Sequence, residues 1–501
     1  MTRRTVSARR LAWQLTAIVL GSGLVWTGVM AQAPQELIIR NGLVVNVDGR
    51  RQADVRVRNG AIAEIGPNLA ATAGAREIDA RGRLLVPGGI DPHSHPMAER
   101  PAQPDRRVIE DYTTVSGAAL AGGVTTVTNF ISKPAAEDVG AFLDRNTALV
   151  EKAGIADFLL HVNLGSDPSW LTPAALQTLV SKGYTSTKTF MREPYFDTNA
   201  VAFVKAFRLS GVAGVLSMIH CEDASTLAEL DERMVADGRG SLTNLALSRP
   251  VVTEELAVQR AVAISETTGA PIYIVHLSSE RALRAAEVGQ SRGLPIYIET
   301  RPMLIHLNES RLLNPDAGLY AGSPPIRSQR DVDALWDGIA RGSVHTVGTD
   351  HGVRTREEKV DPTLNVVTRR EGVSNIQHYR ALLYSEGVRS GRITAEQFVA
   401  VTATNPAKLF GLYPRKGAIQ VGSDADIVIW DPNLKRTIRD ADELSAAKWS
   451  LYDGWEVTGW ATMTIRRGEI VFQDGKVIGK PGTGKVIPQA KWTKPTLTWS
   501  F

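Results

Sequence analysis

Short apolar runs alternate with helical stretches through the middle of the chain. Stretches such as 254–269 and 329–342 have the apolar spacing of helices. This alternation is typical of βα units on a parallel sheet, and eight units predict a (β/α)8 TIM barrel. A doubly wound open sheet is the alternative, but no G-x-G-x-x-G sequence follows the first strand. The eight predicted strands are 84–91, 123–130, 156–164, 185–191, 215–220, 272–277, 296–300 and 345–350.

Both ends of the chain have a different pattern. Residues 36–66, 416–432 and 462–479 alternate in short strands with polar turns, among them Asn-Gly and Asp-Gly. We therefore expect a small β domain made of residues 32–83 and 413–501, on either side of a barrel domain at 84–412.

The first 31 residues read as a signal peptide. Four arginines precede an apolar stretch at 11–29, and small residues then fit cleavage before Gln32. This predicts export, to the periplasm or the medium. The alternative is an uncleaved N-terminal membrane anchor, because this stretch of 19 residues could nearly span a bilayer.

Charge and cysteine content limit the partners and the disulfide bonds that the chain can have. The net charge is +4, and residues 1–33 hold four arginines and no acid, so the rest of the chain is neutral. We therefore expect no nucleic-acid partner, and no membrane partner once the signal peptide is removed. Cys221 is the only cysteine, which excludes an intrachain disulfide.

Metal-binding residue types fall near the ends of the predicted strands. His93 and His95 follow the first strand, His220 ends the fifth, His276 ends the sixth and Asp350 ends the eighth. Active sites of TIM barrels lie at the carboxyl ends of the strands. Nitrogen and oxygen donors in this number suit Zn²⁺ or another divalent first-row metal.

Lys188 lies within the fourth predicted strand, in TSTKTF. An ammonium group beside divalent cations would be repelled. A lysine amine that has reacted with CO₂ becomes an anionic carbamate, whose two oxygens can bridge two metal ions. The alternative is an ordinary ion pair between Lys188 and a carboxylate.

Several motifs, in order, resemble those of the cyclic amidohydrolases. They include PGGIDPHSHPM (87–97), GYTSTKTFM (183–191), MIHCED (218–223), GSPPIRSQRDVDALWDGI (322–339) and VGTDH (347–351). The resemblance is strongest to dihydropyrimidinases and hydantoinases, with allantoinase and dihydroorotase as relatives. It covers residues 36–486.

This resemblance implies a TIM barrel with a small β-sandwich domain, and a centre of two divalent metal ions, most simply Zn²⁺. His93, His95 and Asp350 would bind one ion, and His220 and His276 the other. Carbamylated Lys188 and a hydroxide would bridge them. Asp350 would act as the general base when the hydroxide attacks an amide carbon.

Two substrate-recognition elements depart from the family pattern. The family's substrate-contacting tyrosine, five residues after the lysine, is Glu193 here, and Tyr195 is two residues further on. Glu371 precedes Gly372 where the family has asparagine, whereas the S-P-P element with Ser323 is kept. These differences favour a substrate with a polar or charged group, which Arg192, Glu193 or Glu371 would meet.

The sequence thus predicts an exported, metal-dependent hydrolase that acts on a small molecule. The expected substrate is a cyclic amide that resembles a hydantoin, a dihydropyrimidine or allantoin. One alternative is a linear N-acyl amino acid or peptide deacylase using the same centre. Another is a non-catalytic, dihydropyrimidinase-like binding protein. The resemblance also implies a homo-oligomer, a tetramer or a dimer.

Overall fold

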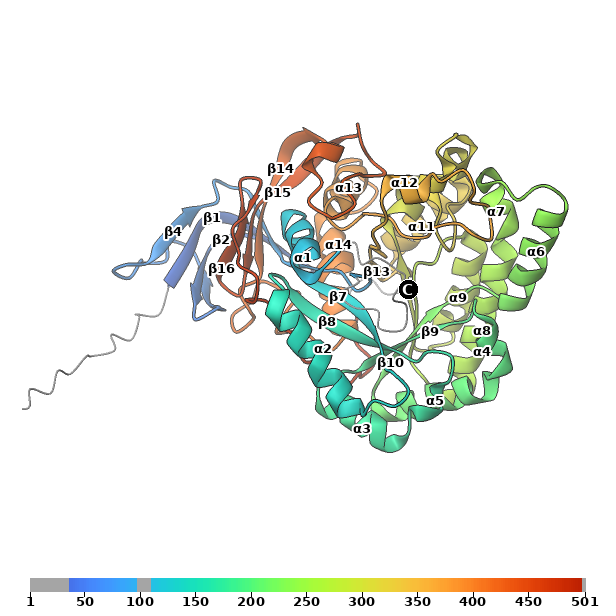
Figure 1. Cartoon of the computed structure of the whole chain (residues 1–501). Helices are drawn as coiled ribbons and strands as arrows, with labels where there is room; N and C mark the ends of the chain where they lie inside the picture. The colour runs from blue at the N-terminus through green and yellow to red at the C-terminus, as the bar shows by residue number, and fades with distance from the viewer. Residues whose placement is uncertain (1–35, 97–109, 498–501) are drawn as a thin grey trace, which may run out of the picture.

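The protein is described by a computed structural model that covers residues 36–96 and 110–497. The predicted signal peptide lies outside these residues. Within them, the fold consists of a barrel of parallel strands surrounded by helices and a separate β domain at its side (Figure 1).

The barrel sheet confirms the predicted fold class. Its eight described strands are parallel and lie in chain order. They are β6 (Gly89–Ile90), β7 (Val124–Ser132), β8 (Asp157–Asn163), β9 (Ser186–Phe190), β10 (Leu216–His220), β11 (Ile272–Ile274), β12 (Ile296–Thr300) and β13 (Thr346–Val347).

The first predicted strand, 84–91, is divided between two sheets. Its first half, β5 (Leu84–Pro87), pairs with strands of the β domain, and only β6 belongs to the barrel. Gly88 joins the two halves where a Cβ atom would lie 2.2 Å from Thr125 Oγ1, so a side chain does not fit. The chain therefore passes directly from one domain into the other.

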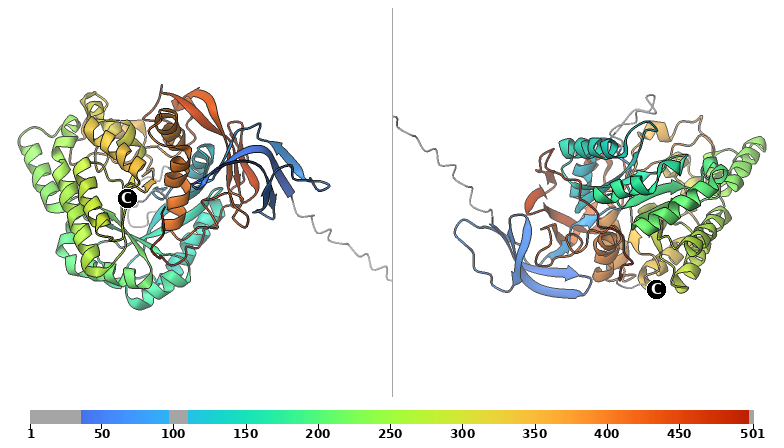
Figure 2. Two further views of the ribbon diagram at one scale, coloured as in Figure 1. Left: turned by 180° about the vertical axis from the view of Figure 1, so that it is seen from behind. Right: turned by 90° about the horizontal axis from the view of Figure 1, so that it is seen from below.

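Helices cover the outer face of the barrel (Figures 1 and 2). None of the described helices is both long enough and apolar enough to cross a membrane. The α-helices are α1 (Tyr112–Ala121), α2 (Val139–Ala153), α3 (Pro173–Ser181), α4 (Pro194–Thr198), α5 (Ala200–Ala213), α6 (Ala224–Ala236), α7 (Leu245–Ser248), α8 (Val251–Thr268), α9 (Glu280–Ser291), α10 (Pro302–His306), α11 (Gln329–Arg341), α12 (Arg356–Lys359), α13 (Tyr379–Leu383), α14 (Ala395–Val399) and α15 (Asn405–Leu409).

The β domain is built from both ends of the described chain. Its nine described strands form one mixed sheet, in the order β17-β16-β15-β14-β5-β1-β2-β3, with β4 paired to β1. The predicted sandwich domain is thus a continuous sheet. The remaining strands are β1 (Glu36–Asn46), β2 (Gly49–Arg58), β3 (Ala61–Gly66), β4 (Arg76–Asp79), β14 (Ile427–Thr437), β15 (Glu456–Arg466), β16 (Glu469–Gln473) and β17 (Lys476–Val477).

The C-terminal tail runs beneath the barrel, at the amino ends of the strands. Backbone hydrogen bonds join Ile487 to Phe158, Gln489 to Gly183 and Trp492 to Gly214. Ile487 is buried in an apolar cluster together with barrel residues. The opposite, carboxyl end of the barrel holds the predicted site residues.

Candidate active site at the carboxyl ends of the barrel strands

His93, His95 and Asp350 meet at the mouth of the barrel. One ligand atom from each lies within 4.8 Å of the others. Asp350 Oδ1 is 3.3 Å from His93 Nε2 and 3.2 Å from His95 Nε2. The Asp350 N–H also donates to the His93 carbonyl at 2.7 Å, which joins the segments after β6 and β13. This confirms that the first and eighth strand ends are adjacent.

His220 and His276 form a second group beside the first. Their ring centroids are 4.5 Å apart, and the His276 ring stacks on His93 at 5.4 Å. His276 and Asp350 both have positive φ angles, 40° and 49°. Non-glycine residues in this region are uncommon and cluster at functional sites.

Lys188 points into the barrel from β9 and is fully buried. Its Nζ atom has no hydrogen-bond partner among the described residues. It lies 5.1 Å and 5.0 Å from the ring centroids of Phe130 and Phe190. Burial lowers the pKa of Lys188 to about 7. Near pH 7 the neutral amine, which is the form that adds to CO₂, is therefore present alongside the ammonium form.

Two of the histidines are held in orientation by buried acidic side chains. His93 Nδ1 lies 2.7 Å from Glu299 Oε1, and His220 Nε2 lies 2.7 Å from Glu222 Oε2. The ring nitrogen that remains on each histidine is free to bind a metal ion, an arrangement usual for histidine ligands. Burial lowers the pKa of His220 to about 3, so this imidazole is neutral, as a ligand must be.

Arg301 is a site residue that the sequence analysis did not single out. It follows β12 directly, its Nη1 contacts Asp350 Oδ2, and its Nη2 donates to the Pro324 carbonyl at 2.8 Å. Burial alone would raise the pKa of Asp350, but the charges of His93 and Arg301 hold it well below its usual range. The rule that found the histidines, polar residues at strand ends, also applies to Arg301.

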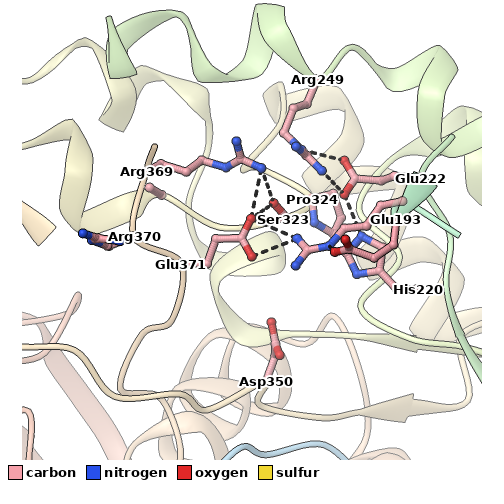
Figure 3. Close-up of polar contacts among 12 residues, drawn as sticks. Glu193, His220, Glu222, Arg249, Ser323, Pro324, Asp350, Arg369, Arg370 and Glu371 are labelled. Atoms are coloured by element: carbon pink, nitrogen blue, oxygen red, sulfur yellow. Dashed lines mark hydrogen bonds and ion pairs between the residues drawn. The ribbon is translucent and has the colours of Figure 1, made fainter. Parts of the chain in front are cut away.

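The predicted substrate residues Ser323 and Glu371 are in contact. Glu371 accepts hydrogen bonds from Ser323 Oγ and Arg369 Nη2, the latter at 3.0 Å (Figure 3). Arg192 Nη1 donates to both Glu371 oxygens, at 2.9 and 2.8 Å. Burial would raise the pKa of Glu371, but Arg192 and Arg369 lower it, so the carboxylate is ionised.

Glu193 and Tyr195 occupy different environments. Glu193 lies beside Arg192, with its Oε1 3.3 Å from Arg192 Nε. The Tyr195 ring stacks on Phe203 of α5 at 6.1 Å between centroids and packs on the apolar core. Among the described residues, the rim of the site is thus made by charged groups, and the Tyr195 ring faces the helix layer.

Comparisons with known proteins show the family of the chain. Residues 84–471 match the model of the Amidohydrolase family. D-hydantoinase of Ralstonia pickettii is 33% identical over 465 residues, which are 91% of this chain and 99% of that protein.

Solved structures give the same result. A D-hydantoinase (dihydropyrimidinase) from Thermus sp. has a TM-score of 0.86 at 33% identity, covering 91% of this chain and 99% of its own. An L-hydantoinase (dihydropyrimidinase) from Arthrobacter aurescens has a TM-score of 0.81 at 27% identity, covering 90% and 99%. The chain belongs to the amidohydrolase family, in its cyclic amidohydrolase group of hydantoinases and dihydropyrimidinases.

Proposed function

We propose that the protein is an exported hydrolase that opens the C–N bond of a cyclic amide at a centre of two divalent metal ions. The observation that carries the proposal is the convergence of six donors at one barrel mouth. The cyclic-amide substrate class is taken from the hydantoinases that the chain resembles. Export is supported by the N-terminal sequence alone, four arginines followed by an apolar stretch.

The residues present fit Zn²⁺, which favours imidazole and carboxylate ligands. In this proposal His93, His95 and Asp350 hold one ion and His220 and His276 the other. The neutral Lys188 amine forms a bond to the carbon of CO₂ and releases one proton to solvent. The resulting carbamate would supply oxygen ligands to the ions. This would give a role to the buried Lys188 nitrogen, which has no hydrogen-bond partner among the described residues.

When bound, the ions supply Lewis-acid activation of water and of the amide carbonyl. The protein residues orient the reactants and move protons. Asp350, which is ionised, accepts the proton of the attacking water and passes it to the leaving nitrogen. Glu299 and Glu222 keep the histidine rings in place.

Metal analysis and substrate turnover test this proposal together. The protein purified after zinc-supplemented expression should hold about two ions per chain, as its ligand set requires. It should also hydrolyse 5-substituted hydantoins or dihydrouracil. Turnover of N-acyl amino acids alone would instead indicate the linear deacylase. Absence of both metal and turnover would indicate a binding protein.

Export is tested by expressing the full chain in a bacterial host and sequencing the N-terminus of the periplasmic fraction. A mature protein that begins at Gln32 is expected. A full-length protein in the membrane fraction would indicate the anchor.

A further inference from the structure

Lys188, Phe190 and Arg192 lie at alternate positions along and just beyond β9. Lys188 and Phe190 belong to β9 and point to the same side of the strand, toward the barrel interior, whereas Arg192 lies in the turn after it. The Phe190 ring centroid lies 5.0 Å from Lys188 Nζ and 5.9 Å from Arg192 Cζ. Arg192 therefore lies next to the candidate metal centre, with one aromatic ring between its guanidinium and the lysine amine.

Only part of the Arg192 guanidinium is engaged. Its Nη1 binds both oxygens of Glu371. Within the described part of the chain, its Nε is buried without a hydrogen bond, and its Nη2 makes none either. The side chain is 22% exposed. The Nε–Nη2 edge is the pair of donors that a carboxylate can bind with both oxygens.

The neighbouring arginines have fewer unpaired donors and are less exposed. Arg249 binds Glu222 through Nε at 3.0 Å and Nη2 at 2.8 Å, and its side chain is 3% exposed. Arg369 uses both terminal nitrogens, on the Val366 carbonyl and on Ser323 and Glu371, and it is 7% exposed. Arg301 likewise uses both terminal nitrogens. Among these four arginines, Arg192 alone combines an Nε–Nη2 edge that makes no hydrogen bond with a partly exposed side chain.

Glu193 occupies this edge without a hydrogen bond. Its Oε1 is 3.3 Å from Arg192 Nε, yet Nε remains without a hydrogen-bond partner. The Glu193 side chain is 40% exposed and makes no capping hydrogen bond to α4, although the residue directly precedes that helix. Arg192 and Arg369 share the single carboxylate of Glu371, so these three side chains together carry one net positive charge when Glu193 turns to solvent.

We infer that the substrate of this enzyme carries a carboxylate group, which binds the Nε–Nη2 edge of Arg192 in place of Glu193. This inference rests on the proposed function, because it names the substrate class of the same site. Glu371 fixes the arginine from its other side, so that little side-chain entropy is lost on binding. A neutral substrate would leave the ion contact with Glu193 unchanged and gain nothing from Arg192.

A pair of nearly isosteric substrates tests the inference. Hydantoin-5-acetic acid and its primary amide differ in charge but little in size. The acid should have the higher kcat/KM, and Arg192→Gln should lower the acid-to-amide ratio by about 10- to 100-fold, the usual effect of a hydrogen bond to a charged group. Arg192→Lys, which keeps the charge but not the planar fork, should give an intermediate ratio.

Two further variants complete the design. Glu193→Gln removes the competing carboxylate and should lower KM for the acid. Arg370→Gln is the matched control, since Arg370 is exposed on the loop of Glu371 and points away from the cluster (Figure 3). Its acid-to-amide ratio should equal that of the wild type. Thermal shifts produced by the acid and by the amide in each variant give a second readout, independent of turnover.

The outcomes separate the two proposals. Equal kcat/KM for acid and amide, or equal loss of both in Arg192→Gln, overturns the carboxylate inference and leaves the hydrolase proposal intact. Absence of turnover for any cyclic amide contradicts the proposed function. In that case the thermal shifts still test the carboxylate inference. If the acid stabilises the protein no more than its amide does, Arg192 is not a carboxylate site.

Discussion

The imidazole of His93 is hydrogen-bonded to Glu299, with 2.7 Å between Nδ1 and Oε1, and this leaves Nε2 directed at Asp350. The same carboxyl group accepts from Tyr273 Oη at 2.8 Å and from the His276 N–H at 3.0 Å. One buried residue thus connects a histidine of each candidate ligand group. Glu299 should therefore affect the affinity of the site for metal ions.

Glu299→Ala should weaken metal binding by about 10- to 100-fold, the usual result of removing such a partner. The loss follows because His93 would no longer be held in one ring orientation. Competition with a chelator measures the affinity, and circular dichroism checks the fold. Tyr273→Phe, which removes one hydrogen bond to Glu299, should have a smaller effect. Unchanged affinity in folded Glu299→Ala would refute this role.

Lys188→Ala should abolish hydrolysis and lower the metal content. A short carboxylic acid such as propionate should restore part of both, because it can place a carboxylate where the carbamate would lie. Metal content and turnover are measured with and without the acid. Lys182→Ala is the control, since Lys182 is at the surface and pairs with Asp144. Full activity of Lys188→Ala would exclude a carbamate bridge.

The strand-end histidines could be predicted because parallel strands bring their carboxyl ends to one edge of the sheet, whatever the loops do. The pairing of Arg192 with Glu371 could not, since 179 residues separate them and the contact depends on how two loops fold. The division of 84–91 between two sheets was also missed, because a continuous apolar run has the same pattern whether it joins one sheet or two. Tyr195 is a tyrosine close to the position where the family has its substrate-contacting tyrosine, yet its ring packs on α5.

Lys416→Met should destabilise the protein by about 3–5 kcal/mol, the usual cost of removing one partner from a buried ion pair. Lys416 Nζ lies 2.8 Å from Asp157, 2.6 Å from Asp426 and 3.3 Å from Asp424, and so connects β8 of the barrel to the segment just before β14 of the β domain. Guanidinium denaturation measures the change. Lys435→Met, at an exposed pair with Glu456, is the control and should change stability by about 0–1 kcal/mol.

The same cluster predicts how stability depends on pH. Burial would raise the pKa of Asp157, but the charges of Lys416 and Arg467 lower it below its ordinary value. A carboxylate with a lowered folded-state pKa stabilises the protein above the unfolded pKa, about 3.9, and this stabilisation is lost as the pH falls through the folded pKa. Without Lys416 the pKa of Asp157 should rise.

The stability deficit of Lys416→Met relative to the wild type should therefore be largest near pH 7 and should shrink as the pH falls toward the unfolded pKa. Melting temperatures of both proteins between pH 3 and pH 8 measure this difference. Curves that differ by a constant amount over this whole range would show that Lys416 does not control the ionisation of Asp157.

The C-terminal tail should contribute to stability through Ile487. This side chain is 2% exposed and packs in the apolar cluster that fills the lower end of the barrel, with Leu159 and Met218. Ile487→Ala should cost about 2–4 kcal/mol, because it removes buried methyl groups and leaves a cavity. Ile478 is 49% exposed, shortly before the tail, so Ile478→Ala should change stability by less than about 0.5 kcal/mol. Urea midpoints of the two variants give the comparison. Equal midpoints would mean that the tail lies on the barrel without supporting its core.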